Sequence, residues 1–63
     1  MRRNPYTARV TAADGTVTTH LTRGTTAGAA LTNLRRQLVG PWTRIEVGLG
    51  EGDAFRMLQG VER

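Results

Sequence analysis

The sequence of 63 residues contains no cysteine, no lysine and no serine. Without cysteine it has neither a disulfide framework nor a thiolate metal site, which are two usual ways of stabilising a small domain. A chain of this length buries only about 60% of the surface that its unfolded form exposes. We therefore expect one small domain over residues 1–63, whose core either suffices alone or is helped by a partner.

Long apolar runs are also absent, because no stretch approaches the roughly 20 residues that cross a bilayer. The leading Met1-Arg2-Arg3 is followed by no apolar segment of the kind found in export signals. We expect a cytoplasmic protein that does not bind membranes. Aromatic residues are scarce as well: one Trp, one Tyr and one Phe are too few for a platform that stacks single-stranded bases.

The charge comes from nine arginines against five acidic residues, which gives a net charge of +4. Arginine used in place of lysine is typical of GC-rich genomes and indicates an accessory protein of a bacterium, plasmid or phage as the source. The planar guanidinium suits phosphates and base edges, and the positive charge attracts polyanions. Nucleic acid is therefore a candidate partner.

Two segments in the first half, Tyr6 to Ala12 and Thr16 to Thr22, alternate in the way typical of strands. Asp14-Gly15 between them favours a two-residue type I′ turn, with Ala13 facing Thr16. The register that follows pairs Ala12 with Val17, Val10 with Thr19 and Ala8 with Leu21 on an apolar face, and Thr11 with Thr18, Arg9 with His20 and Thr7 with Thr22 on a polar face.

A helix is predicted after Gly24, with Thr25 or Thr26 as its N-cap and Gly40-Pro41 beyond its end. Arg35 and Arg36 fall in its last turn, where cations suit the helix dipole. Apolar residues recur at a spacing of three and four, at Ala27, Ala30, Leu31, Leu34 and Leu38, so the helix buries one stripe.

Thr43 to Leu49 is predicted as a third strand, with Ile45, Val47 and Leu49 pointing inward and Trp42, Arg44 and Glu46 pointing outward. Ala54 to Val61 fits either a strand or a helix, and we favour a fourth strand. The fold class is then α+β, in the order ββαβ(β): a small, mostly antiparallel sheet with one helix packed on one face. This order of elements resembles a minimal β-grasp, the ubiquitin-like arrangement, and the resemblance implies nothing about function.

The glycine-rich string from Gly48 to Gly52 resembles the nucleotide-binding turn of Rossmann-like enzymes, in which glycines let the backbone approach a phosphate. Residues 53–63 are too few to supply the following helix and the returning strand. Glu51 and Asp53 would also repel a phosphate. We interpret the string as an ordinary turn.

His20 is the single histidine, and a metal site would need two or three further ligands that no cysteine can supply. The sequence also lacks any obvious nucleophile with a base, or paired carboxylates placed around a pocket. We therefore expect no metal, no cofactor and no enzymatic activity. His20 is interpreted as a solvated strand residue that faces Arg9.

Two binding functions remain. In the first, the uncovered sheet face binds duplex DNA, and residues 1–5 form a mobile basic arm. In the second, an exposed strand edge joins a protein partner or a second copy, giving a homodimer. Trp42 is either an exposed binding residue or a lid over the core. The candidate binding residues are Arg2, Arg3, Arg9, His20, Trp42, Arg44 and Arg56.

Overall fold

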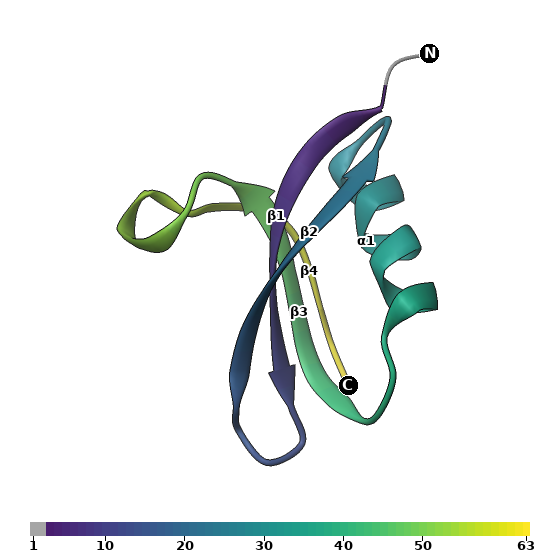
Figure 1. The fold of residues 1–63 in the computed structure, drawn as a ribbon, viewed down its shortest axis with the longest axis vertical. Helices are drawn as coiled ribbons and strands as arrows, with labels where there is room; N and C mark the ends of the chain where they lie inside the picture. The colour runs from purple at the N-terminus through teal and green to yellow at the C-terminus, as the bar shows by residue number, and fades with distance from the viewer. Residues whose placement is uncertain (1–2) are drawn as a thin grey trace.

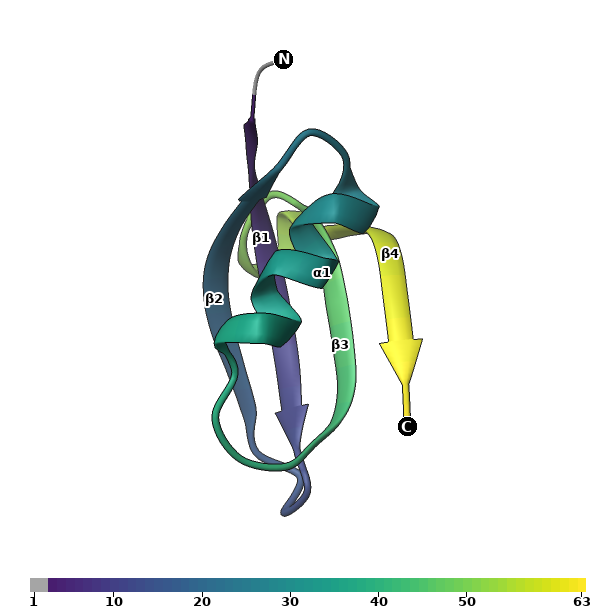
Figure 2. The same cartoon turned by 90° about the vertical axis from the view of Figure 1, so that its right-hand side faces the viewer.

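The computed structural model describes residues 3–63 as one four-stranded antiparallel sheet with a single helix against one face (Figures 1 and 2). The sheet order is β2-β1-β3-β4, and every neighbouring pair is antiparallel. In chain order the elements are β1 (Asn4–Ala12), β2 (Val17–Gly24), α1 (Ala27–Gln37), β3 (Trp42–Leu49), a short 3₁₀ helix η1 (Gly52–Ala54) and β4 (Arg56–Glu62).

The α+β class and the fourth strand are confirmed, whereas the likeness to the β-grasp arrangement is not. Within residues 3–63, no helix has the length and apolar character needed to cross a bilayer. The first strand starts earlier than expected, because Asn4 pairs with Gly24 and Pro5 with Arg23. The predicted arm of residues 1–5 is therefore wrong for its last two residues, and Arg2 lies outside the described part of the chain.

The turn between β1 and β2 has three residues, and the predicted type I′ turn is wrong. Gly15 has a φ of 91°, but Asp14 does not have the positive φ that a type I′ turn requires. Gly15 N–H donates to the Ala12 carbonyl at 3.0 Å, and Ala12 N–H donates to the Thr16 carbonyl at 2.8 Å. This is a type I turn followed by a left-handed glycine. Asp14 Oδ1 supports it by accepting from Thr16 N–H at 2.9 Å.

The extra turn residue shifts the register by one, so that every β2 side chain lies on the opposite face from the one expected. Val10 faces Thr18 and Ala8 faces His20, in place of Thr19 and Leu21. Leu21, predicted to be in the core, is 76% exposed.

The residues of β2 that face α1 are threonine, histidine and glycine. Thr22 is buried, and its hydroxyl donates to the Ala30 carbonyl at 3.0 Å. Gly24 lies so close to α1 that a Cβ added there would sit 2.4 Å from the Ala30 nitrogen. The small residue thus permits the close approach of the helix to the sheet.

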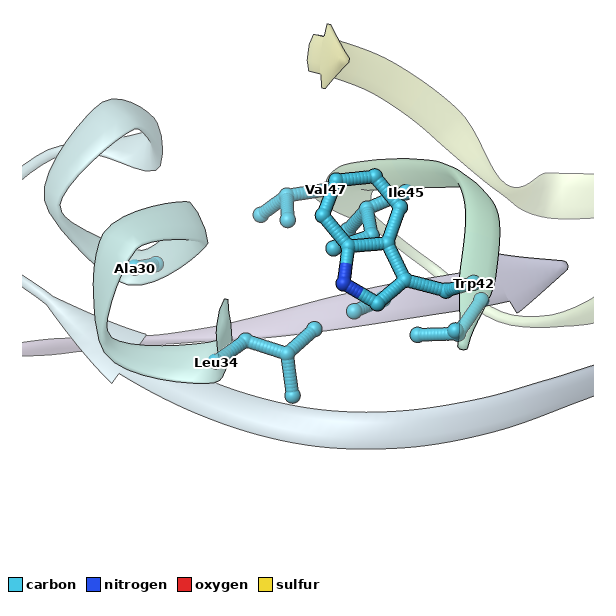
Figure 3. Close-up of a cluster of buried hydrophobic side chains, with 7 residues drawn as sticks. Ala30, Leu34, Trp42, Ile45 and Val47 are labelled. Atoms are coloured by element: carbon cyan, nitrogen blue, oxygen red, sulfur yellow. The ribbon is translucent and has the colours of Figure 1, made fainter. Parts of the chain in front are cut away.

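The helix begins as predicted, with Thr26 in an extended conformation and its Oγ1 accepting from Ala29 N–H at 3.1 Å. Ala30 and Leu34 are its buried residues. Figure 3 shows both of them pointing toward Trp42, Ile45 and Val47 of β3. The core consists of Ala8, Val10, Ala30, Leu34, Trp42, Ile45 and Val47.

An irregularity in strand pairing changes which side chains of β3 face the core. Between β1 and β3 the register shifts after Thr11, so that Ala12 pairs with Trp42 and Thr43 is the extra residue. Trp42 is thereby brought onto the helix side and is only 7% exposed. The predicted outward direction of Trp42 is wrong for this reason. Leu49, predicted to point inward, is exposed.

A pair of glycine substitutions tests the contact between β2 and α1. Gly24→Ala should lower the free energy of unfolding by about 1–3 kcal/mol, because the new Cβ meets backbone that cannot move aside. Gly28→Ala should raise it by up to about 1 kcal/mol, because a Cβ there has open space and alanine favours the helix. Urea unfolding of both variants measures the difference. Equal stability of Gly24→Ala and wild type would contradict the close approach.

The turn also makes stability depend on pH. The backbone N–H and hydroxyl of Thr16 donate to Asp14 and lower the pKa of that carboxyl. The contribution of the Asp14 carboxyl to the free energy of unfolding is therefore fully present above an aspartate's ordinary pKa of about 3.9, and it is lost as the pH falls through the lowered pKa of the folded state. Asp14→Ala should melt below wild type at neutral pH, and the gap should close in acid. Glu51→Ala, which removes a carboxylate without a capping bond, is the control and should show no such convergence.

Candidate nucleic-acid interface

The open face of the sheet, opposite α1, carries a mixture of charges. Arg44 forms ion pairs with Glu46 at 3.5 Å and with Glu62 at 3.4 Å. Glu62 is also its cross-strand partner on β4. Such exposed pairs contribute little to stability. They do, however, compensate the charge of one arginine that was expected to bind a polyanion.

Arg9, the other strand arginine of that face, is held by the loop between β3 and β4. This loop projects on the side of the sheet opposite α1 (Figure 1). The Arg9 guanidinium donates to the Gly52 carbonyl at 2.7 Å and lies 4.3 Å from the centre of the Phe55 ring. Glu46 is its cross-strand neighbour. Arg9 is therefore only partly exposed and already has partners within the chain.

The remaining residues predicted for this face do not complete a basic surface. His20 lies on the helix side, paired with Ala8, and its Nε2 is 2.8 Å from Thr18 Oγ1. The expected pairing of His20 with Arg9 is wrong because of the register shift. Trp42 belongs to the core, so its interpretation as a lid is the one that holds. Arg56 is exposed at the start of β4.

Arginines without acidic neighbours border two shallow hollows, one at the outer edge of β2 and one against α1. One shallow hollow along β2 is bordered by Arg3, Arg23 and Arg36. A second hollow is bordered by Arg35, Arg36 and Arg63, so that Arg36 joins the two. No carboxylate among residues 3–63 lines either hollow. We call Arg3, Arg23, Arg35, Arg36 and Arg63 the arginine surface.

Contacts with Trp42 and between elements hold this surface together. The guanidinium carbons of Arg35 and Arg63 lie 5.5 and 4.5 Å from the centre of the Trp42 ring. Cation–π contacts of this kind fix the position of a guanidinium without neutralising it. Asn33 Nδ2 donates to the Arg23 carbonyl at 2.8 Å and ties α1 to β2. Among residues 3–63, the only arginine in an ion pair is Arg44.

Sequence reasoning assigned Arg35 and Arg36 to the helix dipole and did not recognise them as part of a larger surface. A signal for it is present in the sequence: residues 15–45 contain four arginines and no acidic residue. Because α1 and β2 both come from this stretch, the layer that they form is free of carboxylates. Of the candidate residues within 3–63, only Arg3 lies on the arginine surface with its side chain exposed.

Within residues 3–63, no cluster of three or more His, Cys, Asp or Glu side chains could hold a metal ion. The glycine-rich string connects β3 to the antiparallel β4 through η1. It therefore does not lead from a strand into the long helix that a nucleotide-binding turn requires.

Fold and surface together define a class: a small α+β domain with one antiparallel sheet, one helix and an arginine surface around α1 and the edge of β2. No family model, curated protein or solved structure matches the chain.

The environment of Trp42 can be measured directly, because it is the single tryptophan of the chain. Buried beneath Arg35 and Arg63, its fluorescence should be quenched by acrylamide several-fold less efficiently in the folded protein than in urea. Quenching of equal efficiency in the folded and the unfolded protein would contradict the burial of Trp42 against the core. Tyr6→Phe, which leaves the tryptophan in place, serves as the control and should give the wild-type result.

Proposed function

We propose that this protein binds nucleic acid through the arginine surface. The observation that carries the proposal is the separation of charge between the open face of the sheet and the arginine surface. Glu46 and Glu62 lie on strands of the open face, and Glu51 and Asp53 lie in the loop that projects from it. The five arginines of the arginine surface border hollows that no Asp or Glu side chain lines. A polyanion would therefore meet attraction at the arginine surface and mixed charge on the open face.

Phosphate groups are the chemistry that this surface fits best. A guanidinium presents several donors in one plane and binds phosphate oxygens in pairs. Arg35 and Arg63 are positioned by Trp42, so little side-chain freedom would be lost when they bind. Contacts of this kind position a protein on nucleic acid without reading the bases. The binding that we propose is thus independent of sequence and strongly dependent on salt.

Duplex DNA is favoured over single strands, because single-strand binders need exposed aromatic rings on which bases stack. Trp42 is buried, Tyr6 is half-buried and Phe55 is covered on one side by Arg9. None of these rings lies exposed on the arginine surface. Backbone contacts to a duplex need no stacking and match the features that are present.

The test compares two double variants that remove the same charge, one from the arginine surface and one from outside it. Arg23→Ala/Arg36→Ala should weaken binding to a fluorescent random duplex and lower the salt slope by about 0.9 for each phosphate that the variant no longer neutralises. Arg44→Ala/Arg56→Ala should leave both quantities close to wild type. Fluorescence anisotropy between about 50 and 200 mM salt measures the slope. Thermal melting confirms that each variant is folded.

Two results would overturn the proposal. If both double variants bind the duplex equally weakly, binding follows net charge and not the arginine surface. If the wild-type protein binds no duplex at about 50 mM salt, where a cationic protein binds most tightly, nucleic-acid binding itself is wrong.

A second candidate function, assembly through a strand edge, is favoured by a different observation. β2 is one of the two outer strands of the sheet and carries two exposed apolar side chains, Val17 and Leu21. An edge of this kind invites pairing with another strand.

A further inference from the structure

The hydrogen-bonding phase of β2 determines which of its backbone groups are unpaired. Ala12 N–H donates to the Thr16 carbonyl, so this pair is a hydrogen-bonded one. In an antiparallel ladder such pairs alternate with non-bonded ones. The N–H and C=O groups of residues 18, 20 and 22 therefore point toward β1. The groups of Val17, Thr19 and Leu21 point away from the sheet.

Arg23 provides an independent check of this phase. It is two residues beyond Leu21, so its carbonyl should also point outward. That carbonyl does accept a hydrogen bond from outside the sheet, from Asn33 Nδ2 of α1 at 2.8 Å. The helix thus occupies one end of the β2 edge and leaves the stretch from Val17 to Leu21 open.

The two edges of the sheet differ in how they resist pairing. β4 has an irregular register opposite Val47 and Gly48, and it starts with Arg56 and ends with Glu62. Bulges and charges of this kind discourage the addition of a strand. β2 pairs with β1 without a register shift and contains no proline, and its one charged side chain, Arg23, is near its end. The open edge is therefore that of β2.

We propose that two copies of this protein pair antiparallel through β2, about a two-fold axis at Thr19. In this register Val17 faces Leu21 of the second copy, Thr19 faces Thr19, and Leu21 faces Val17. The outward N–H and C=O groups of Val17, Thr19 and Leu21 then all find hydrogen-bond partners in the second copy. A shift by two residues would set Val17 against Arg23 in one direction, or Leu21 against Gly15 in the other.

Side chains favour the same register. Val17 is 58% and Leu21 76% exposed in the single chain, and their cross-strand contact would shield both from water. Arg23 would lie beside Asp14 of the second copy at each end of the seam, where opposite charges meet. Asp14 lies in the turn that precedes β2, whereas the other four acidic residues of the sequence follow residue 45. The two Arg23 side chains would lie at opposite ends, so they do not repel each other closely.

Such a dimer would place both helices on one side. A two-fold axis that relates adjacent antiparallel strands of one sheet runs perpendicular to that sheet. The two arginine surfaces would then face the same way, with Arg23 and Arg36 closest to the seam. The pairing itself does not depend on the proposed nucleic-acid function, because the interface is made by Val17, Thr19 and Leu21.

Cysteine variants test the register, since the natural chain has none. Residues 19 of the two copies would form a hydrogen-bonded pair about 5.5 Å apart between Cα atoms, within the range that a disulfide spans. Residues 17 would be about 13 Å apart, because four residues separate them along the strands. Under the same mild oxidation without DNA, Thr19→Cys should therefore form a covalent dimer and Val17→Cys should remain a single chain on a non-reducing gel.

Mass in solution tests the association without any cysteine. Light scattering at about 100 μM should give the mass of two chains for the wild type. Leu21→Asp should weaken association at least tenfold, because it places a carboxylate against valine. Val39→Asp is the matched control, since Val39 is 99% exposed and lies in the loop after α1, and it should associate like wild type.

Three results would overturn the dimer: a wild-type mass of one chain, equal cross-linking of both cysteine variants, or equal weakening by both aspartates. A mass of one chain together with intact DNA binding would reject the dimer alone. A mass of two chains without any DNA binding would reject the nucleic-acid function alone.

Discussion

The phase of β2, set by the three-residue turn at Ala13 to Gly15, is the constraint on which the rest of the structure depends. It turns Thr22 and Gly24 toward α1, where the hydroxyl bonds the Ala30 carbonyl and the glycine allows the helix to approach. The opposite phase would direct Arg23 beneath the helix and place its charge in the core. Burying an unpaired charge costs several kcal/mol, which exceeds the gain from burying Leu21, about 1.5–3 kcal/mol.

The same phase shapes both surfaces that we propose as functional. Because Arg23 is kept out of the core, it lines the hollow that Arg36 borders from the helix. Because Val17 and Leu21 are displaced from the core, they lie exposed beside the unpaired backbone of the outer strand. The arginine surface and the open edge thus have a common origin in one turn, although they would bind different partners.

The sequence predicts the elements well and their relative phase poorly. Local signals locate the four strands and the helix with its Thr26 cap, because capping and periodicity are encoded within a few neighbouring residues. Register depends on a single turn residue, and Asp-Gly is compatible with both a two-residue and a three-residue turn. The bulge at Thr43 brings Trp42 inward against the strand alternation, and no residue type marks such a bulge in advance. For the same reasons His20 and Trp42, expected on the open face, lie on the helix side.

Charge could have corrected the prediction where periodicity failed. Extending the alternation of β2 by two residues brings in Arg23 and Gly24, and only one phase keeps the arginine out of the core and the glycine against the helix. Burying the charge of Arg23 would cost more free energy of folding than burying Val17 and Leu21 in place of Thr19 would gain, because a misplaced charge costs more than an exposed methyl group. Residues 3–63 form a core of seven side chains. In so small a core the polar residues and the glycine determine the register, and exposed apolar side chains are the consequence. That ordering of costs explains why Val17 and Leu21 lie exposed on the outer strand β2.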